Sequence, residues 1–191
     1  MIIGVLALQG AFIEHEAVLK RLHVECFEIR KPSDLDRRMD GLIIPGGEST
    51  VIGKLLVDMD MMNRIRKMIL DGMPVLGTCA GMILLARNIV DGTVDSIGTM
   101  PVTVRRNAYG RQLGSFSADG SFGDLGGIQM RFIRAPYVDS VDEGVEILSV
   151  HEGRIVAVRY GNQLATAFHP ELTDDDRVHR YFLSIVESST C

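Results

Sequence analysis

Short apolar runs and amphipathic segments alternate along the first half of the chain. Four runs have the continuous apolar pattern of strands that are buried on both faces, namely residues 2–8, 24–29, 41–45 and 74–78. Three other segments have the spacing or length of helices, namely residues 12–22, 61–69 and 80–86. Strands that alternate with helices predict an α/β fold with a doubly wound, mostly parallel sheet flanked by helices.

Two details of the helical segments lead to further expectations. Ser49 or Thr50 is expected to cap the helix after the third strand, because a short side-chain oxygen accepts a bond from a free amide at that position. Met61, Met62 and Met68 fall at helical spacing and are expected to fill the core rather than to bind a ligand.

The second half of the chain has a different pattern. Residues 145–150, 155–160 and 164–168 are successive short strands, which predict an antiparallel extension of the sheet. Residues 178–186 have the spacing of an amphipathic helix that docks on the sheet, preceded by acidic residues that suit its positive end. The glycine-rich residues 91–127 show weak periodicity and predict no definite element.

Composition narrows the class of protein. The 191 residues, 46% of them hydrophobic and 24% charged, are expected to form a single domain over residues 1–191. The formal net charge of −5 and the lack of basic runs exclude nucleic acid as an expected partner. The first apolar run stops at Gln9, so no membrane span is expected. Three widely spaced cysteines, an odd number, favour a reducing compartment and hence the cytoplasm.

Residues 77–81 read GTCAG between a predicted strand and a predicted helix, the pattern of a nucleophile elbow. A sharp strand-to-helix turn exposes the central side chain, here Cys79, and the flanking glycines let the two elements approach. The amides and dipole at a helix N-terminus favour the thiolate. The alternative is that Cys79 is a small buried apolar residue, as many cysteines are. Cys26, in a predicted strand, and Cys191, the last residue, receive no role.

A nucleophilic cysteine needs a base and a group that orients the base. Residues 169–171 read HPE just after the last predicted strand. In extended backbone, residues two apart point to the same side, so the Glu171 carboxylate can reach the His169 imidazole. The alternative is a surface turn. The other histidines are weaker candidates: His15 lies in a predicted helix, and His179 is expected on the exposed side of the last helix.

The loop after the third strand reads GGEST at residues 46–50. Its backbone amides, including that of Gly47, are candidates for one half of an oxyanion hole, and the amide of Ala80 for the other half. A phosphate-binding loop is the competing interpretation, but the spacing from Gly47 to Gly53 is one residue too long and Leu55 stands at the magnesium-binding position. Cys79, His169 and the other histidines lack zinc-ligand spacing, so no metal site is expected.

Three segments together resemble the class I glutamine amidotransferases with a Cys-His-Glu triad; they are PGGEST at 45–50, GTCAG at 77–81 and HPE at 169–171. Within that family the chain resembles the glutaminase subunits of pyridoxal 5′-phosphate synthases, on the strength of three further segments, LQG at 8–10, RRNAYGRQ at 105–112 and FIRAP at 132–136. The resemblance extends from residue 1 to about residue 187, and the glycine-rich residues 119–127 are the part that it does not place.

The resemblance implies a role for each matching residue. Cys79 attacks the side-chain amide of L-glutamine, His169 is the acid and base, and Glu171 orients His169. The residues implied to bind glutamine are Gly46, Gly47, Glu48, Arg106, Ile133 and Arg134. A cationic Arg106 suits the substrate carboxylate and an anionic Glu48 its ammonium group. Without the resemblance, Arg106 and Arg134 would be interpreted as solvated surface arginines.

The implied function is hydrolysis of glutamine to glutamate and ammonia, with the ammonia delivered to the synthase subunit of pyridoxal 5′-phosphate synthase in a hetero-oligomeric complex. This chemistry requires neither a cofactor nor a metal. The alternatives are the glutaminase subunit of another amidotransferase, a different cysteine hydrolase, or a non-catalytic binding subunit. The intact Cys79, His169 and Glu171 argue against the last of these.

Overall fold

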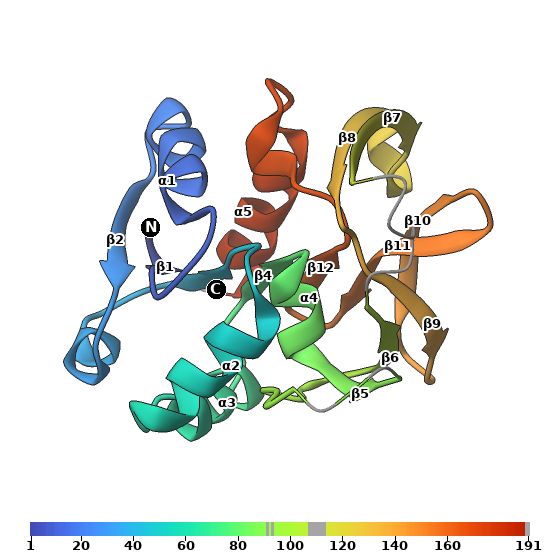
Figure 1. The fold of residues 1–191 in the computed structure, drawn as a ribbon. Helices are drawn as coiled ribbons and strands as arrows, with labels where there is room; N and C mark the ends of the chain where they lie inside the picture. The colour runs from blue at the N-terminus through green and yellow to red at the C-terminus, as the bar shows by residue number, and fades with distance from the viewer. Residues whose placement is uncertain (91, 93, 107–113, 190–191) are drawn as a thin grey trace.

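The computed structural model describes residues 1–90, 92, 94–106 and 114–189 (Figure 1). Strands and helices alternate through the first half, in the order β1 Ile2–Leu6, α1 Phe12–Arg21, β2 Glu25–Ile29, the 3₁₀ helix η1 Pro32–Asp36, β3 Gly41–Ile44, α2 Ser49–Asp58, α3 Met62–Leu70, β4 Val75–Thr78 and α4 Ala80–Leu85. The four strands predicted there from apolar runs are confirmed, each with one end trimmed by one or two residues.

The second half consists mainly of strands. In chain order its elements are β5 Ala86–Ile89, β6 Met100–Arg105, β7 Ser115–Ser121, η2 Gly123–Leu125, β8 Gly127–Ile133, β9 Tyr137–Val141, β10 Glu146–His151, β11 Arg154–Tyr160, β12 Gln163–Thr166, η3 Pro170–Leu172 and α5 Arg177–Ser189. Strands β6 and β7 and the start of β8 lie in the region where weak periodicity predicted no definite element.

Parallel strands form the centre of the main sheet in the order β2-β1-β3-β4-β12. The chain passes from β1 to β2 on one side and then returns to β3 on the other side of β1. The direction of winding therefore reverses between β1 and β3. In open α/β sheets, ligands bind beyond the carboxyl ends of the strands at such a reversal.

The rest of the main sheet is largely antiparallel. It continues from β12 through β11, β9 and β6, each pair antiparallel, then to β5, which is parallel to β6, while β10 pairs with β11. The predicted doubly wound sheet with an antiparallel extension is thus confirmed. One detail differs: β12 was expected in the extension, but it runs parallel to β4 and extends the parallel centre.

Helices cover both faces of the parallel strands. In Figure 1, α1 and α5 lie above these strands, and α2, α3 and α4 lie below them. Helix α5 packs closely on the sheet, since a Cβ on Gly41 of β3 would lie 2.9 Å from Val186 and 3.2 Å from Phe182. Met61 and Met62 are buried, which confirms the expected core role of the methionines around α3.

Two expectations about the helices are wrong. Neither Ser49 nor Thr50 caps α2, because the helix already begins at Ser49 and Glu48 occupies the cap position without a side-chain bond. His179 is fully buried, not exposed. Its side of α5 faces α1, where a hydrogen bond to His15 provides a polar partner that spacing within a single helix does not reveal.

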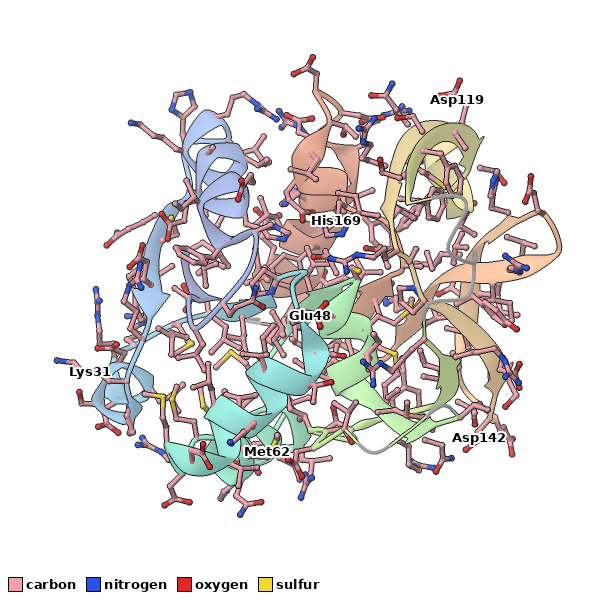
Figure 2. All side chains as sticks on the ribbon, viewed as in Figure 1. Lys31, Glu48, Met62, Asp119, Asp142 and His169 are labelled. Carbon is pink, nitrogen blue, oxygen red and sulfur yellow. The ribbon has the colours of Figure 1, made fainter. Side chains whose placement is uncertain are left out.

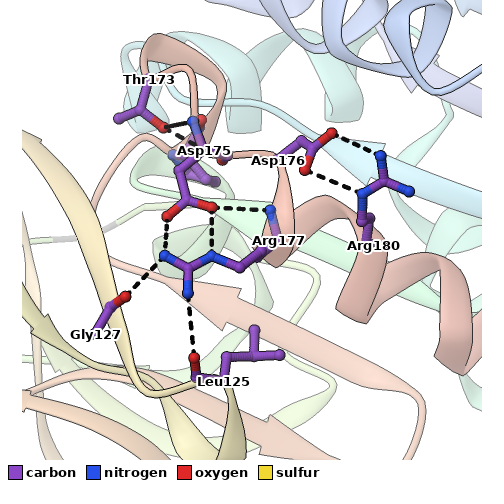
Figure 3. Close-up of polar contacts among 8 residues, drawn as sticks. Leu125, Gly127, Thr173, Asp175, Asp176, Arg177 and Arg180 are labelled. Carbon is purple, nitrogen blue, oxygen red and sulfur yellow. Dashed lines mark hydrogen bonds and ion pairs between the residues drawn. The ribbon is translucent and has the colours of Figure 1, made fainter.

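Strands β7 and β8 form a separate antiparallel hairpin that is tied to the start of α5. The Arg177 guanidinium donates to the carbonyl oxygens of Leu125 and Gly127 and is held by the Asp175 carboxylate (Figure 3). Residues 119–127, which the resemblance did not place, are the end of β7, the turn of this hairpin and the first residue of β8. Among the described residues, no helix is both long and apolar enough to span a membrane.

Candidate active site

The predicted site residues converge at the carboxyl edge of the parallel strands. Cys79 directly follows β4, the 46–48 loop follows β3, and His169 comes three residues after β12. Figure 2 shows Glu48 and His169 near the middle of the view, on the loops after β3 and β12. Because these strands are parallel, their carboxyl ends lie at the same edge, and this brings distant segments together.

The turn at Cys79 has the geometry of a nucleophile elbow. Cys79 has φ +49° and ψ −98°, which is rare for a residue with a Cβ, and its amide is bonded to the Thr166 carbonyl on β12 at 2.7 Å. A Cβ on Gly81 would lie 2.1 Å from the Ile44 carbonyl, and one on Gly77 would lie 2.8 Å from the Gly81 backbone. The two glycines are therefore needed for α4 to begin directly against β3 and β4.

His169 and Glu171 form a buried pair beside the thiol. The Nδ1 atom of His169 lies 2.6 Å from Oε1 of Glu171, and both side chains are almost fully buried. The amide of His169 is bonded to the Arg131 carbonyl on β8, which fixes the backbone at the imidazole. With Nδ1 on the carboxylate, the ring presents Nε2 to the Cys79 side, as a general base requires.

Electrostatics favour a charged His169. Burial by itself lowers the pKa of His169, but hydrogen bonds with Cys79 and Glu171 outweigh burial and raise it to about 10. Burial also opposes the charge of Glu171, yet the imidazoles of His15 and His169 hold the pKa of this carboxyl below its usual value. The site therefore favours an imidazolium beside a carboxylate.

A cavity of about 270 Å³ opens in front of the thiol. Cys79 and His169 line it together with all the residues implied to bind substrate, namely Gly46, Gly47, Glu48, Arg106, Ile133 and Arg134. The thiol of Cys79 also faces the Ile133 carbonyl at 3.8 Å. The cavity is smaller than most drug-sized sites, which are roughly 300–1,000 Å³, and its size suits a single amino acid.

Opposite charges line this cavity. Glu48 is exposed at the N-terminus of α2, while Arg106 donates to Thr50 on the first turn of that helix at 3.2 Å. Arg134 has φ +42° directly after β8, a bend that carries its backbone to the cavity wall. An amino acid carries both an ammonium and a carboxylate, and the wall has a partner of opposite charge for each.

The candidate oxyanion loop is held by residues 9–11. The Gly46 carbonyl accepts the Ala11 amide at 2.9 Å, and the side-chain oxygen of Gln9 accepts the Glu48 amide at 2.7 Å. A Cβ on Gly46 would lie 2.2 Å from Cε1 of His169. Glycine at 46 is therefore required for the loop to lie against the His169 imidazole. Ala80, the other candidate donor, is the first residue of α4 and is buried.

Sequence reasoning missed three residues around the site. Gln9 belongs to the LQG motif, and its side chain anchors the 46–48 loop by accepting the Glu48 amide. His15 and His179 received no role, whereas both are fully buried behind Glu171. Their spacing of 164 residues leaves no local signal, and only the packing of α1 against α5 brings them together. Residues 107–112 of the RRNAYGRQ segment lie outside the described residues, as does Cys191.

A family model identified as the SNO glutamine amidotransferase family matches residues 5–188. The chain belongs to this family. The resemblance to glutamine amidotransferases that its motifs carry is thereby confirmed. A crystal structure described as a glutamine amidotransferase superposes with a TM-score of 0.93 at 46% identity, covering 98% of this chain and 100% of that one. A glutamine amidotransferase from Thermotoga maritima, 14% identical with a TM-score of 0.63, covers 98% of this chain and 82% of that one and shares the fold.

Relatives with the name pyridoxal 5′-phosphate synthase subunit PdxT match nearly the whole chain. The protein of Methanocorpusculum labreanum is 56% identical over 97% of this chain and 98% of its own length. That of Desulfitobacterium hafniense strain Y51 is 55% identical over 97% and 94%. That of Streptococcus pneumoniae serotype 2 is 51% identical over 100% of both chains.

Proposed function

We propose that this chain is the glutaminase subunit of a pyridoxal 5′-phosphate synthase. It hydrolyses L-glutamine to L-glutamate and ammonia and delivers the ammonia to a synthase subunit in a hetero-oligomeric complex. The observation that carries the proposal is that Cys79 and His169, with Glu171 paired to His169 behind them, face one cavity that Glu48 and Arg106 also line. Full-length similarity to proteins named as PdxT subunits supports the choice of synthase.

The first half of the reaction forms a thioester. The Cys79 thiolate attacks the side-chain carbonyl carbon of glutamine, and the amides of Gly47 and Ala80 stabilise the oxyanion that develops. The imidazolium of His169 then gives its Nε2 proton to the leaving nitrogen, so ammonia departs and the thioester remains. Glu171 stays a carboxylate and keeps Nδ1 of His169 protonated.

The second half releases glutamate. Neutral His169 takes a proton from a water molecule, which attacks the thioester carbonyl, and the tetrahedral intermediate collapses to glutamate and the Cys79 thiolate. Throughout, Arg106 binds the substrate carboxylate and Glu48 the ammonium, while Ile133 and Arg134 hold the extended substrate through their backbone. The reaction consumes one water and needs neither a metal nor a cofactor.

The proposed setting is the cytoplasm. Cys26 and Cys79 are both free thiols, and a nucleophilic thiol stays active only where it remains reduced. L-glutamine is the small-molecule ligand.

The test is an assay of glutamate and ammonia with the purified chain and the synthase subunit of the same organism. We expect equal amounts of glutamate and ammonia from L-glutamine, and a far lower rate with L-asparagine, whose side chain is one carbon shorter. Mass spectrometry of an acid-quenched reaction should find the glutamyl group on the peptide that contains Cys79. Absence of glutamate from the mixture of both subunits would refute the proposal.

A further inference from the structure

Two fully buried histidines extend the polar chain behind Glu171. His15 on α1 has its Nε2 3.5 Å from Oε2 of Glu171 and 3.2 Å from the Thr78 hydroxyl. Its Nδ1 lies 2.9 Å from Nε2 of His179 on α5. Buried polar groups are costly unless they are paired, so a histidine pair between two packed helices calls for an explanation.

The arrangement of protons follows from the carboxylate. Within the part of the chain that the structure describes, Oε2 of Glu171 has no hydrogen bond of ordinary length. The ion-pair contact of this oxygen is with Nε2 of His15, at 3.5 Å. If His15 carried its proton on Nδ1, two lone pairs would face each other across this 3.5 Å gap. A proton on Nε2 removes that repulsion, and this N–H then faces both the Glu171 carboxylate and the Thr78 hydroxyl.

The same arrangement assigns a role to His179. With its proton on Nε2, His15 has an acceptor at Nδ1, and Nε2–H of His179 is the donor that faces it. Among the residues that the structure describes, the buried nitrogen left over is Nδ1 of His179, which is then an unpaired acceptor and not an unpaired N–H. An unpaired acceptor is the better tolerated of the two.

We propose that His15 is a positioning residue for the glutaminase reaction. Neutral and protonated on Nε2, it holds Oε2 of Glu171 so that Oε1 stays on Nδ1 of His169, and His179 fixes this tautomer of His15. The proposal rests on the triad in the proposed function. His15 is 0% exposed and does not line the substrate cavity, so it acts through Glu171 and not on the substrate.

The surrounding charges are consistent with a neutral His15. Burial lowers the pKa of His15, Glu171 opposes this, and His169 lowers it further, so that the net direction is down. Burial and His15 lower the pKa of His179 to about 3. The other charged groups that act on the pair are Glu14, Arg21 and Asp176. A neutral His15 can orient the Glu171 carboxylate as a hydrogen-bond donor, and it leaves intact the negative charge of Glu171 that stabilises the imidazolium of His169.

Variants of His15 can show whether this side chain orients the Glu171 carboxylate or only fills space between α1 and α5. His15→Leu removes the N–H, whereas His15→Gln keeps a donor for Glu171 and an acceptor for His179. His23→Asn is the matched control, because His23 is exposed near the same helix and asparagine tolerates its φ of +58°. Each variant is assayed with the synthase subunit for kcat and KM across pH 5.5–9.

We expect His15→Leu to lower kcat at least tenfold with little change in KM, and His15→Gln to stay within threefold of the wild type. The acid limb of the rate profile should also move to higher pH in His15→Leu, because the buried Glu171 carboxylate loses the N–H that faces its Oε2 at 3.5 Å and is protonated more readily. A pH-independent loss, an unchanged rate, or a failure of His15→Gln to restore activity would overturn the proposal.

Nitrogen NMR of the wild-type chain with labelled imidazoles tests the tautomer without turnover. The proposal requires His15 to be protonated on Nε2 and bare on Nδ1 at pH 7. Protonation on Nδ1, or on both nitrogens, would overturn it even if His15→Leu fails to fold. This NMR measurement does not depend on glutamate release. A failure of the proposed function is therefore seen separately, as wild-type subunits that release no glutamate.

Discussion

Cys79 combines an unfavourable backbone conformation with a small, enclosed side chain. Its positive φ places the thiol between the Ile133 carbonyl and the His169 imidazole, and the bond of its amide to Thr166 holds it there. Non-glycine residues in this conformation are costly and persist where the surrounding structure determines them. The strain is therefore a property of the turn and not of the sulfur atom.

Cys79→Ala should abolish glutaminase activity and leave the fold intact. Alanine at 79 keeps the same backbone conformation and loses only the sulfur, so we expect a rate at least about 10³-fold lower and a melting temperature close to that of the wild type. Glutamate release with the synthase subunit and a thermal melt measure the two quantities. A modest loss of activity would rule out Cys79 as the nucleophile.

The other described cysteine supplies the internal control for this prediction. Burial, Glu16 and Glu25 raise the pKa of the half-buried Cys26 thiol, which disfavours its thiolate. An electrophilic glutamine analogue should therefore label Cys79 and leave Cys26 unmodified, as peptide mass spectrometry can show. Comparable labelling of both would contradict the assignment of the elbow.

Glu171→Gln should lower kcat by about 10²-fold or more, because it removes the charge that favours imidazolium on His169.

The pH dependence of stability follows from the raised pKa of His169. The folded state holds this proton more tightly than the unfolded chain, so the stabilisation is complete below about pH 6.5 and is lost as the pH rises toward about 10. The wild type should therefore melt at a higher temperature than Glu171→Gln. This difference in melting temperature should be largest near pH 6–7 and smaller at pH 10. A gap that widens with pH would contradict this assignment.

At the scale of elements, the β7–β8 hairpin connects the start of α5 to the substrate cavity. Arg177 ties the hairpin turn to α5, and β8 ends at Ile133, on the cavity wall. The Arg131 carbonyl on the same strand accepts the His169 amide. The hairpin thus positions both the Ile133 backbone at the cavity and the loop that bears His169.

Arg177→Gln should loosen this attachment and raise the KM for glutamine about three- to tenfold, with a smaller effect on kcat. Arg180→Gln is the matched control, since Arg180 lies one turn further along α5 and pairs with Asp176 on the surface without touching the hairpin. Amide exchange of residues 115–133 should be faster in Arg177→Gln alone. Equal kinetic effects of the two substitutions would show that the attachment does not position the site.

At the scale of the whole molecule, the oxyanion loop is connected to the surface through residues 9–11. Free ammonia in neutral water is mostly protonated and loses its nucleophilicity, so hydrolysis is useful only when the partner is docked. The bonds of Gln9 and Ala11 to the 46–48 loop offer a path for this control, because turning the peptide between Gly46 and Gly47 breaks the bond from Ala11.

The isolated chain should therefore be a poor glutaminase that the synthase subunit activates. One missing oxyanion donor lowers turnover roughly 10²–10³-fold, and we expect activation of that size at saturating glutamine. Glutamate release is measured with and without the synthase subunit. The complex that contains Cys79→Ala gives the background rate of glutamate release. Equal rates in the two conditions would refute gating while leaving the glutaminase assignment intact.

The sequence by itself determined the parallel half of the fold and the residues proposed for the triad. Buried strands need continuous apolar runs, and a nucleophile elbow needs small residues at fixed positions, so residues 2–8 and 77–81 carry their structure locally. His169 and Glu171 are two residues apart, and their contact follows from extended backbone. Residues 115–121 show no apolar run because neither face of β7 is fully buried, whereas β8 alternates exposed and buried residues.

Only the tertiary structure decided how distant segments meet. The direction of β12 follows from its pairing with β4, which no pattern within residues 163–166 expresses. The pairing of His15 with His179 depends on how α1 and α5 pack across 164 residues, and each histidine alone looks like an ordinary helical residue. Local spacing sets which groups a segment presents, whereas burial and polar pairing between segments are properties of the folded chain.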